Sequence, residues 1–386
     1  MENQKVSFEG QCLYVGIDVH KKQWSISIFS NELHHKTFSQ APSPASLKSY
    51  LDLHFPHAKI NCAYEASKFG FWIQRELSAY GYQCLVVNPA DIPTSNKEAA
   101  GKTDPIDSRK IGKTLRSGLL TSIHVPAVHT EGDRQLFRYR KKLWGDLVKV
   151  KNRIKDKLLF AGINIPAELD GGAWTKAFLK WLKDLEIQAA STRLTLDLLL
   201  DQYHYLYKHF LKVSTQVRSL QRLPRYKDNA KLLRGIPGIG PLTTVQLLCE
   251  IEDINRFPSF KKLNSFVGFK PSSHSSGEHD WRGRMTYRQH KELRSSLVEC
   301  AWTTIGVDPV MMQRYEELKK RITAKRAIII IARKLLSRIY YVLKNQKPYE
   351  LGVIKKIQTN TENKMLSNQK VTQDHLTFIE SRSLLL

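Results

Sequence analysis

The segment Leu13–His20, Leu-Tyr-Val-Gly-Ile-Asp-Val-His, is almost wholly apolar and contains one acid, Asp18. A short apolar run of this kind is typical of a buried strand. A carboxylate inside such a strand costs free energy unless it is paired or binds a metal ion. The segment therefore predicts both a central strand and a functional acid.

Three further acids fit the same interpretation. Glu65 directly follows the apolar run Ile60–Tyr64, which also reads as a strand, and Asp104 and Asp107 lie in Lys-Thr-Asp-Pro-Ile-Asp-Ser-Arg-Lys. The spacing of this pair, i and i+3, places both carboxylates on one face of a helix. Asp104 can alternatively be a simple helix-start acid before a proline. If the four acids converge, their oxygens can bind Mg²⁺, most simply as a pair of ions acting on a phosphodiester.

The surrounding residues 12–126 alternate between strand and helix patterns. We expect strands over 13–19, 24–29, 35–38, 60–64 and 84–87, and helices over 44–53, 69–80 and 105–115. Three strands followed by strand–helix units predict an α/β domain with a mixed sheet, which fits a ribonuclease H-like architecture.

The remaining chain reads as mostly helical, so the fold class is α/β plus all-α. Apolar residues spaced by three or four, from Leu136 to Leu158 and again along roughly 185–220, predict two long helices that pair as a coiled coil within residues 131–222. A helical domain over 228–350 follows, and residues 351–386 form a polar tail with little periodicity.

Basic side chains occupy the polar face of the first long helix. We expect a nucleic-acid contact there, although a solvated charged face is the alternative. The candidate residues are Arg138, Lys149, Lys151, Arg153 and Lys155.

The stretch Gly235-Ile-Pro-Gly-Ile-Gly240 resembles the turn of helix–hairpin–helix modules. In such turns, Gly238 and Gly240 would let the backbone approach a phosphate, and the next helix would offer free N–H groups. A tight turn between core helices is the alternative.

A serine-rich stretch, Phe269–Glu278, forms a second candidate site. It lies near Lys270, Arg282 and Arg284, so it can bind phosphate, or one of its serines can attack it once the hydroxyl is deprotonated. From composition alone, a flexible loop is the favoured interpretation of this stretch.

The overall composition indicates a polyanionic partner. The 386 residues include 61 Lys+Arg and 36 Asp+Glu, for a formal net charge of +25. No apolar run is long enough to span a bilayer, so we expect no membrane partner. Five scattered cysteines without paired spacing, and no signal-peptide pattern, lead us to expect a reduced, cytoplasmic protein.

Several motifs occur in one order along the chain: Gly-Ile-Asp-Val-His-Lys, Tyr-Glu-Ala-Ser, Lys-Thr-Asp-Pro-Ile-Asp-Ser-Arg-Lys-Ile, Gly-Ile-Pro-Gly-Ile-Gly-Pro and Ser-Ser-Gly-Glu. This ordered set resembles the DEDD transposases of the one-hundred-and-ten family of insertion sequences, also called bridge-RNA-guided recombinases. The resemblance spans about residues 12–350. It departs from the family downstream of the serines, where Met285–Arg294 lacks the Gly-Asn pair that often precedes Tyr-Leu-Arg.

The resemblance implies a RuvC-like domain with Asp18, Glu65, Asp104 and Asp107 as metal ligands and catalytic acids. It also implies a coiled coil and a C-terminal transposase domain whose serine forms a covalent link to DNA. That serine corresponds to Ser276, next to the glycine, or to Ser275. The implied partners are donor and target DNA, a noncoding guide RNA and further copies of the chain, as a dimer or tetramer.

Two other functions fit the same residues. One is a metal-dependent branched-DNA nuclease in which water attacks and the serines only bind phosphate. The other is a nucleic-acid-binding scaffold without catalysis. A covalent protein–DNA adduct separates the recombinase from both.

Overall fold

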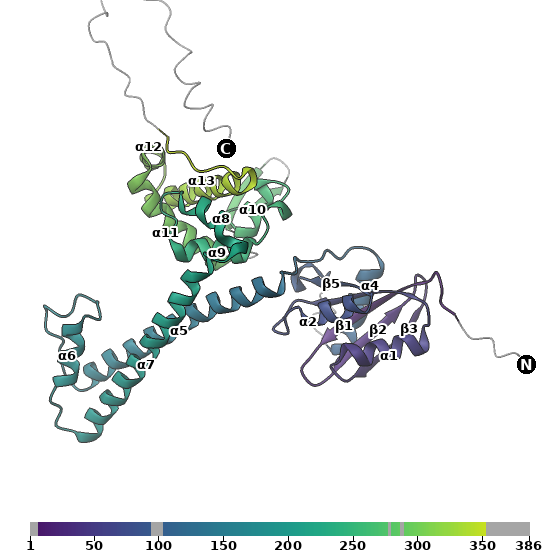
Figure 1. Cartoon of the computed structure of the whole chain (residues 1–386), viewed down its shortest axis with the longest axis horizontal. Helices are drawn as coiled ribbons and strands as arrows, with labels where there is room; N and C mark the ends of the chain where they lie inside the picture. The colour runs from purple at the N-terminus through teal and green to yellow at the C-terminus, as the bar shows by residue number, and fades with distance from the viewer. Residues whose placement is uncertain (1–6, 94–102, 277–278, 286–288, 353–386) are drawn as a thin grey trace, which may run out of the picture. The chain divides into compact units, whose positions relative to one another are not determined.

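A computed structural model of the chain describes residues 7–93, 103–276, 279–285 and 289–352, and the side chains of residues 271–288 lie outside that description. The chain divides into two compact units, Met1–Pro126 and Ala127–Leu386 (Figure 1). None of the described helices is both long and apolar enough to cross a membrane.

A five-stranded mixed sheet forms the centre of the first unit. Its order is β3-β2-β1-β4-β5. The first three strands pair antiparallel as a meander, whereas β4 runs parallel to both β1 and β5. The bounds are β1 Cys12–Val19, β2 Trp24–Phe29, β3 His34–Gln40, β4 Lys59–Glu65 and β5 Gln83–Val87. The predicted α/β class and mixed sheet are confirmed.

Helices cover both faces of this sheet. Side chains from α1 and α2 join the larger apolar core on one face, and α4 packs on the other with Ala63 and Val87. The helix bounds are α1 Pro44–His54, α2 Trp72–Ala79, the short η1 Pro89–Asp91 and α4 Asp104–Arg116. Because α4 begins at Asp104, both acids of the predicted pair lie in its first turn.

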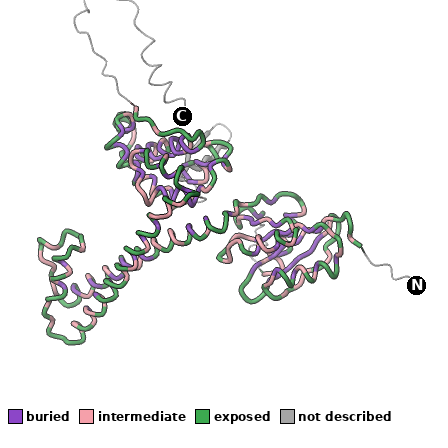
Figure 2. The backbone as a smooth tube through the Cα atoms, in the orientation of Figure 1, coloured by how far each residue is buried: buried purple, intermediate pink, exposed green. Residues whose placement is uncertain are grey.

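Two long antiparallel helices begin the second unit, and their buried residues face each other along the pair (Figure 2). They are α5 Val128–Phe160 and α7 Ala190–Leu220, with the shorter α6 Lys176–Asp184 between them. On α5 the predicted apolar positions Leu143, Leu147, Val150, Ile154 and Leu158 are buried.

The second long helix differs from the prediction. It begins at Ala190 rather than near Leu185, and Leu194, Leu198 and Tyr205 are exposed instead of packed. The buried positions in that stretch are Leu196, Leu200 and Tyr203. Because leucines occupy both faces of this stretch, periodicity alone could not decide which face packs against α5.

The C-terminal part of the second unit is a helical bundle with one hairpin. Its helices are α8 Pro224–Arg234, α9 Pro241–Ile251, η2 Ile254–Arg256, α10 Phe260–Val267, α11 Lys291–Val307, α12 Pro309–Lys319 and α13 Ala324–Asn345. The hairpin consists of β6 Pro271–Ser276 and β7 His279–Met285. The expectation of a loop at the serine-rich stretch was therefore wrong, because its residues up to Ser276 pair with β7 as a strand.

Candidate active site

The pleat of the sheet decides which face Asp18 occupies. Side chains alternate along a strand, and Leu13, Val15 and Ile17 point into the core shared with α1 and α2. Asp18 therefore belongs to the opposite face, which α4 covers. On the neighbouring parallel strand Tyr64 is the partner of Ile17, so Glu65 is in phase with Asp18. Two acids thus end adjacent strands on the same face.

Two glycines bring α4 unusually close to β1. A Cβ on Gly16 would lie 2.1 Å from the carbonyl oxygen of Ser108, and one on Gly112 would lie 2.7 Å from the ring of Phe29. Any larger residue at Gly16 would have to push the backbone of α4 away from the sheet. The close approach holds the first turn of α4, with Asp104 and Asp107, beside the end of β1.

A buried hydroxyl cluster fixes the same helix to β2. The Ser108 hydroxyl lies 3.0 Å from that of Ser25 and 2.8 Å from that of Ser27. Ser27 in turn contacts the hydroxyl of Thr37 on β3 at 2.8 Å. These bonds satisfy polar groups that would otherwise be costly to bury. Serines in a strand carry no signal of a distant partner, so the sequence did not predict this support.

His20, which was not among the predicted site residues, lies beside the acids. Its Nδ1 lies 3.4 Å from Oδ2 of Asp18 and 3.9 Å from Oδ2 of Asp104. These three residues offer ligand atoms within 4.8 Å of one another, a spacing that suits one metal ion. The available signal was its position, two residues after Asp18 at the end of the strand.

The charge of Asp18 is coupled to the other three acids. Burial, as the largest cause, and the charges of Asp104, Asp107 and Glu65 together raise the pKa of Asp18 from 3.8 to about 6, although the nearby His20 lowers it. The structure thus brings the other three predicted acids within electrostatic range of Asp18. Mutual repulsion among carboxylates is the condition that a bound cation relieves.

The donor set fits a divalent ion. Oδ2 of Asp18 is buried and accepts no hydrogen bond within the described part of the chain. A buried carboxylate oxygen that accepts no hydrogen bond is costly unless a cation or donor compensates it. Carboxylates are the hard oxygen ligands that Mg²⁺ prefers, and His20 adds a nitrogen that Mn²⁺ also accepts.

The predicted serines lie in the hairpin of the second unit. Ser276 ends β6 and pairs with His279, and Ser275 pairs with Asp280. The side chains of Ser275, Ser276, Arg282 and Arg284 lie outside the described residues. Lys270, directly before β6, is exposed.

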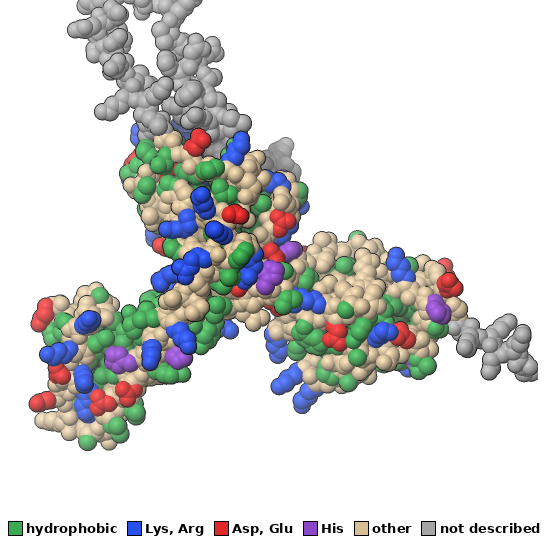
Figure 3. All heavy atoms as spheres, in the orientation of Figure 1, with side chains coloured by type: hydrophobic (Ala, Val, Ile, Leu, Met, Phe, Trp, Pro, Cys, Tyr) green, Lys and Arg blue, Asp and Glu red, His purple; other side chains and the backbone are tan. Residues whose placement is uncertain are grey.

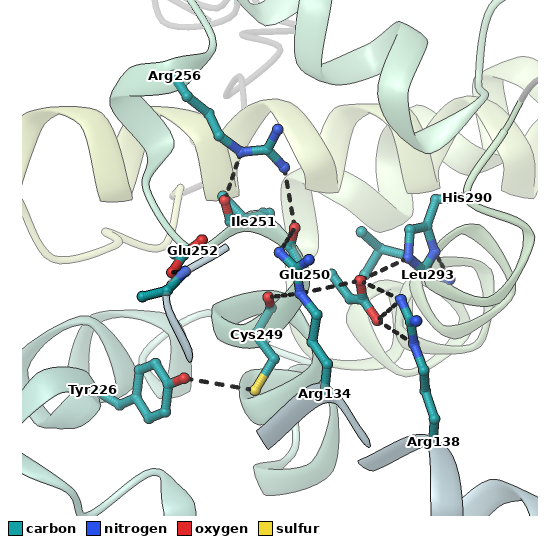
Figure 4. Close-up of polar contacts among 11 residues, drawn as sticks. Arg134, Arg138, Tyr226, Cys249, Glu250, Ile251, Glu252, Arg256, His290 and Leu293 are labelled. Carbon is teal, nitrogen blue, oxygen red and sulfur yellow. Dashed lines mark hydrogen bonds and ion pairs between the residues drawn. The ribbon is translucent and has the colours of Figure 1, made fainter. Parts of the chain in front are cut away.

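A buried carboxylate, Glu250 of α9, anchors the chain that follows this hairpin (Figure 4). His290, the N-cap of α11, approaches Glu250 Oε2 at 3.1 Å through Nε2. Arg138 of α5 donates to both carboxylate oxygens, at 3.0 and 3.1 Å. Burial alone would raise the pKa of Glu250, but the hydrogen bond and charge of His290, with Arg138 and Arg134, hold it below its usual value. Glu250 thus ties α5 to the start of α11.

The predicted nucleic-acid contacts differ in how free their charges are. Arg138 is hydrogen-bonded to Glu250. Lys151 lies among three aromatic rings, and its Nζ is 5.2 to 5.8 Å from the centroids of Trp144, Trp174 and Tyr203. Burial lowers the pKa of Lys151. Lys149 and Arg153 are exposed, although Lys149 also contacts Asp146 at 3.0 Å. Figure 3 shows such basic side chains along the coiled coil, interspersed with exposed apolar ones.

The predicted glycine turn connects α8 and α9, as its sequence suggested. Gly238 has φ +85°, and a Cβ there would lie 2.5 Å from the Cys300 carbonyl oxygen. Thr304 also donates to the Pro237 carbonyl at 2.9 Å. Gly238 therefore packs against α11, which supports the alternative of a turn between core helices. Gly240 is the N-cap of α9, and a Cβ there would meet no described atom within 4 Å.

Comparison with known proteins places this arrangement in a family. A DEDD transposase model of the IS110 type matches residues 15–162, and the model for the transposase IS116/IS110/IS902 family matches residues 230–316. The chain belongs to the IS110 family of transposases. It is therefore a DNA transposase, an enzyme of DNA recombination, and the DEDD match covers all four acids described above.

Relatives support this over most of the chain. The transposase is 24% identical over 363 residues to the transposase for insertion sequence element IS1533 of Leptospira borgpetersenii, covering 89% of this chain and 99% of that one. It is 27% identical over 308 residues to the transposase for IS1328 of Yersinia enterocolitica, covering 78% and 84%. A pilin gene-inverting protein of Moraxella bovis is 34% identical over 130 residues, 33% of this chain and 40% of that protein.

Proposed function

We propose that this transposase cuts and rejoins DNA at a metal-dependent site built by Asp18, Glu65, Asp104 and Asp107 on a ribonuclease H-like, RuvC-like domain. The observation that supports it most strongly is the buried Oδ2 of Asp18, which accepts no hydrogen bond among the described residues and lies near three other acids. The strand order β3-β2-β1-β4-β5 is consistent with the domain type. Mg²⁺, as two ions in this proposal, would polarise the phosphate and offset its charge.

The protein's own residues supply the geometry. Gly16, Gly112 and Ser108 hold α4 against the sheet, so that Asp104 is presented at a fixed place relative to Asp18. His20 lies near both carboxylates, with Nδ1 3.4 Å from Oδ2 of Asp18 and 3.9 Å from Oδ2 of Asp104. A site held rigidly in this way needs little reorganisation when a phosphodiester binds.

We further propose that Ser276 is the nucleophile, with Ser275 as the alternative. Its Oγ would form a bond to phosphorus as the bond to the leaving deoxyribose oxygen breaks. The serine hydroxyl would lose its proton, and the leaving deoxyribose oxygen would take up a proton. A phosphoserine ester conserves the energy of the broken bond, so a new DNA end can be joined without an external energy source. Water as nucleophile would stop the reaction at cleavage.

The proposed partners follow from the charge and the family. A net charge of +25 suits a protein that holds donor DNA, target DNA and a structured guide RNA, recognised by shape and phosphate contacts. The lysines and arginines proposed to touch these nucleic acids are Lys149, Arg153, Lys155, Lys270, Arg282 and Arg284. Assembly into a dimer or tetramer would allow several acid sites and serines to act together.

Substitution of the acids tests the metal site. Asp18→Asn and Asp107→Asn should abolish strand cleavage of a plasmid carrying the DNA that flanks the gene, while binding of the plasmid and of copurified RNA persists. Exposed Asp201→Asn is the matched control and should cleave normally. Wild-type cleavage by both active-site variants would refute the assignment. A recombining Ser275→Ala, Ser276→Ala double variant would instead refute the serine and favour a water-using nuclease.

A further inference from the structure

A basic hollow of about 460 Å³ opens directly beside the acids. Its lining includes Lys21 and Lys22 from the turn between β1 and β2, Lys68 and Phe69 from the segment after β4, and His20 and Asp104 of the acid cluster. These segments all lie at the carboxyl ends of the parallel strands β1 and β4, the usual place for a ligand on such a sheet. We call these residues the basic hollow.

The charges of the basic hollow are available to a ligand. Within the described part of the chain, Lys21, Lys22 and Lys68 form no ion pair. Three ammonium groups therefore line a space to which the described residues contribute one carboxylate, that of Asp104. Cations without a carboxylate partner, held at one edge of an acidic metal site, match a phosphate chain that passes across that site.

The aromatic ring in the basic hollow adds a second contact. Phe69 is half-buried and packs against the core of the sheet. The Lys68 Nζ lies 5.6 Å from the centroid of that ring. An aromatic face flanked by cations is the usual arrangement for single-stranded nucleic acid, in which a base stacks on the ring and lysines bind the adjoining phosphates.

We propose that the basic hollow binds an unpaired nucleotide of the DNA strand that is cut, next to the scissile phosphate. This rests on the proposed metal site. In it, Phe69 stacks on the base and Lys21, Lys22 and Lys68 bind the flanking phosphates. Bases inside a duplex already stack on their neighbours, so the ring can receive a base only where the strand is unpaired or the base is turned out. DNA is favoured over the guide RNA because Asp104 belongs both to the hollow and to the acid site of a DNA transposase.

Crosslinking provides a direct readout at Phe69. The full-length Asp18→Asn variant, which holds DNA without cutting it, is irradiated with a short oligothymidylate carrying 5-iodo-deoxyuridine, and the crosslinked peptides are identified by mass spectrometry. The proposal predicts a crosslink at Phe69 that Phe69→Leu removes. Absence of any crosslink at Phe69 would overturn it, as would an equal yield from a fully paired duplex or a higher yield from the matching oligouridylate.

Salt dependence tests the lysines. Lys21→Gln with Lys68→Gln should lower the slope of log K against log salt for the same oligothymidylate by about 0.7 for each phosphate that a lysine no longer neutralises. The charge-matched control is Lys36→Gln with Lys59→Gln, two exposed lysines of the same unit outside the hollow. Equal slopes for both pairs would overturn the assignment.

Failure of this proposal is distinguishable from failure of the proposed function. If Asp18→Asn still cleaves, the metal site is wrong whatever the crosslinks show. If Asp18→Asn is inactive and Phe69 does not crosslink, the metal site stands and the basic hollow does not bind the strand.

Discussion

Asp18→Asn should stabilise the metal-free first unit at neutral and alkaline pH. Burial and the neighbouring acids raise the pKa of Asp18 to about 6 in the folded chain, from 3.8. A rise of about two pKa units corresponds to about 3 kcal/mol at 1.36 kcal/mol per unit. Asparagine keeps the size of the side chain and removes the charge, so this penalty should disappear in the variant.

The direction with pH follows from linkage. Because the folded pKa is the higher one, the folded protein gains stability from the Asp18 proton below about pH 4 and loses it as the pH rises through about 6. In EDTA the wild type should therefore lose about 3 kcal/mol between these limits relative to Asp18→Asn. Mg²⁺ at pH 8 should restore stability to the wild type and leave the variant unchanged.

Buried cysteines report the two units separately. Cys62 is fully buried in the first unit and Cys249 is buried in the second, so the urea dependence of thiol reactivity at each measures local unfolding. Reaction with 4,4′-dithiodipyridine, which proceeds in acid as well as at neutral pH, is read by peptide mass spectrometry. The urea midpoint of Cys62 reactivity should fall with rising pH in the wild type relative to Asp18→Asn. If it does not fall, Asp18 is not destabilised by burial and by repulsion from its neighbours. A matching shift at Cys249 would show that the effect is not local.

Three further substitutions follow from the packing and charges. Gly16→Ala should destabilise the first unit by about 3 kcal/mol or more, because the added Cβ meets the α4 backbone. The urea midpoint of Cys62 reactivity should therefore fall. It should fall less in the control Gly118→Ala, which changes a surface glycine with φ +69°. Glu250→Gln should lower the stability of the second unit by about 3 kcal/mol, measured at Cys249, because it leaves His290 and Arg138 without their carboxylate. The control Glu317→Gln, at an exposed ion pair, should change stability by under about 1 kcal/mol. Lys149→Gln with Arg153→Gln should lower the slope of log K against log salt for nucleic-acid binding by about 0.7–0.9 for each phosphate that these residues neutralise. Lys151→Gln should instead mainly loosen the packing of the aromatic rings around it. An unchanged slope in the Lys149, Arg153 double variant would show that this face is exposed only to solvent.

The sequence was informative where local patterns were unambiguous. The apolar run that contains Asp18 and the run that precedes Glu65 form adjacent parallel strands, and their shared phase follows from the pleat. Asp104 and Asp107 open a helix because Pro105 and the spacing of the pair favour it. These features depend on residues near one another in the chain.

Long-range contacts were not predictable in the same way. Nothing in the sequence shows that Ser108 contacts Ser25 and Ser27, which lie about eighty residues away. Nor does it show that the missing side chain of Gly16 lets α4 approach β1 closely. Arg138 looked like a free cation because its partner Glu250 lies more than a hundred residues away. The serine-rich stretch lacked strand-favouring residues, and its pairing with β7 overrode that weak preference.

The proposed serine mechanism is best tested by a search for a covalent link between protein and DNA. The transposase with its copurified RNA is incubated with DNA flanking the gene in Mg²⁺, denatured and trimmed with nuclease, and the peptides are analysed by mass spectrometry. We expect a nucleotide on Ser276 that is absent in EDTA and in Asp18→Asn. Cleaved DNA ends without any protein adduct would contradict it and favour attack by water.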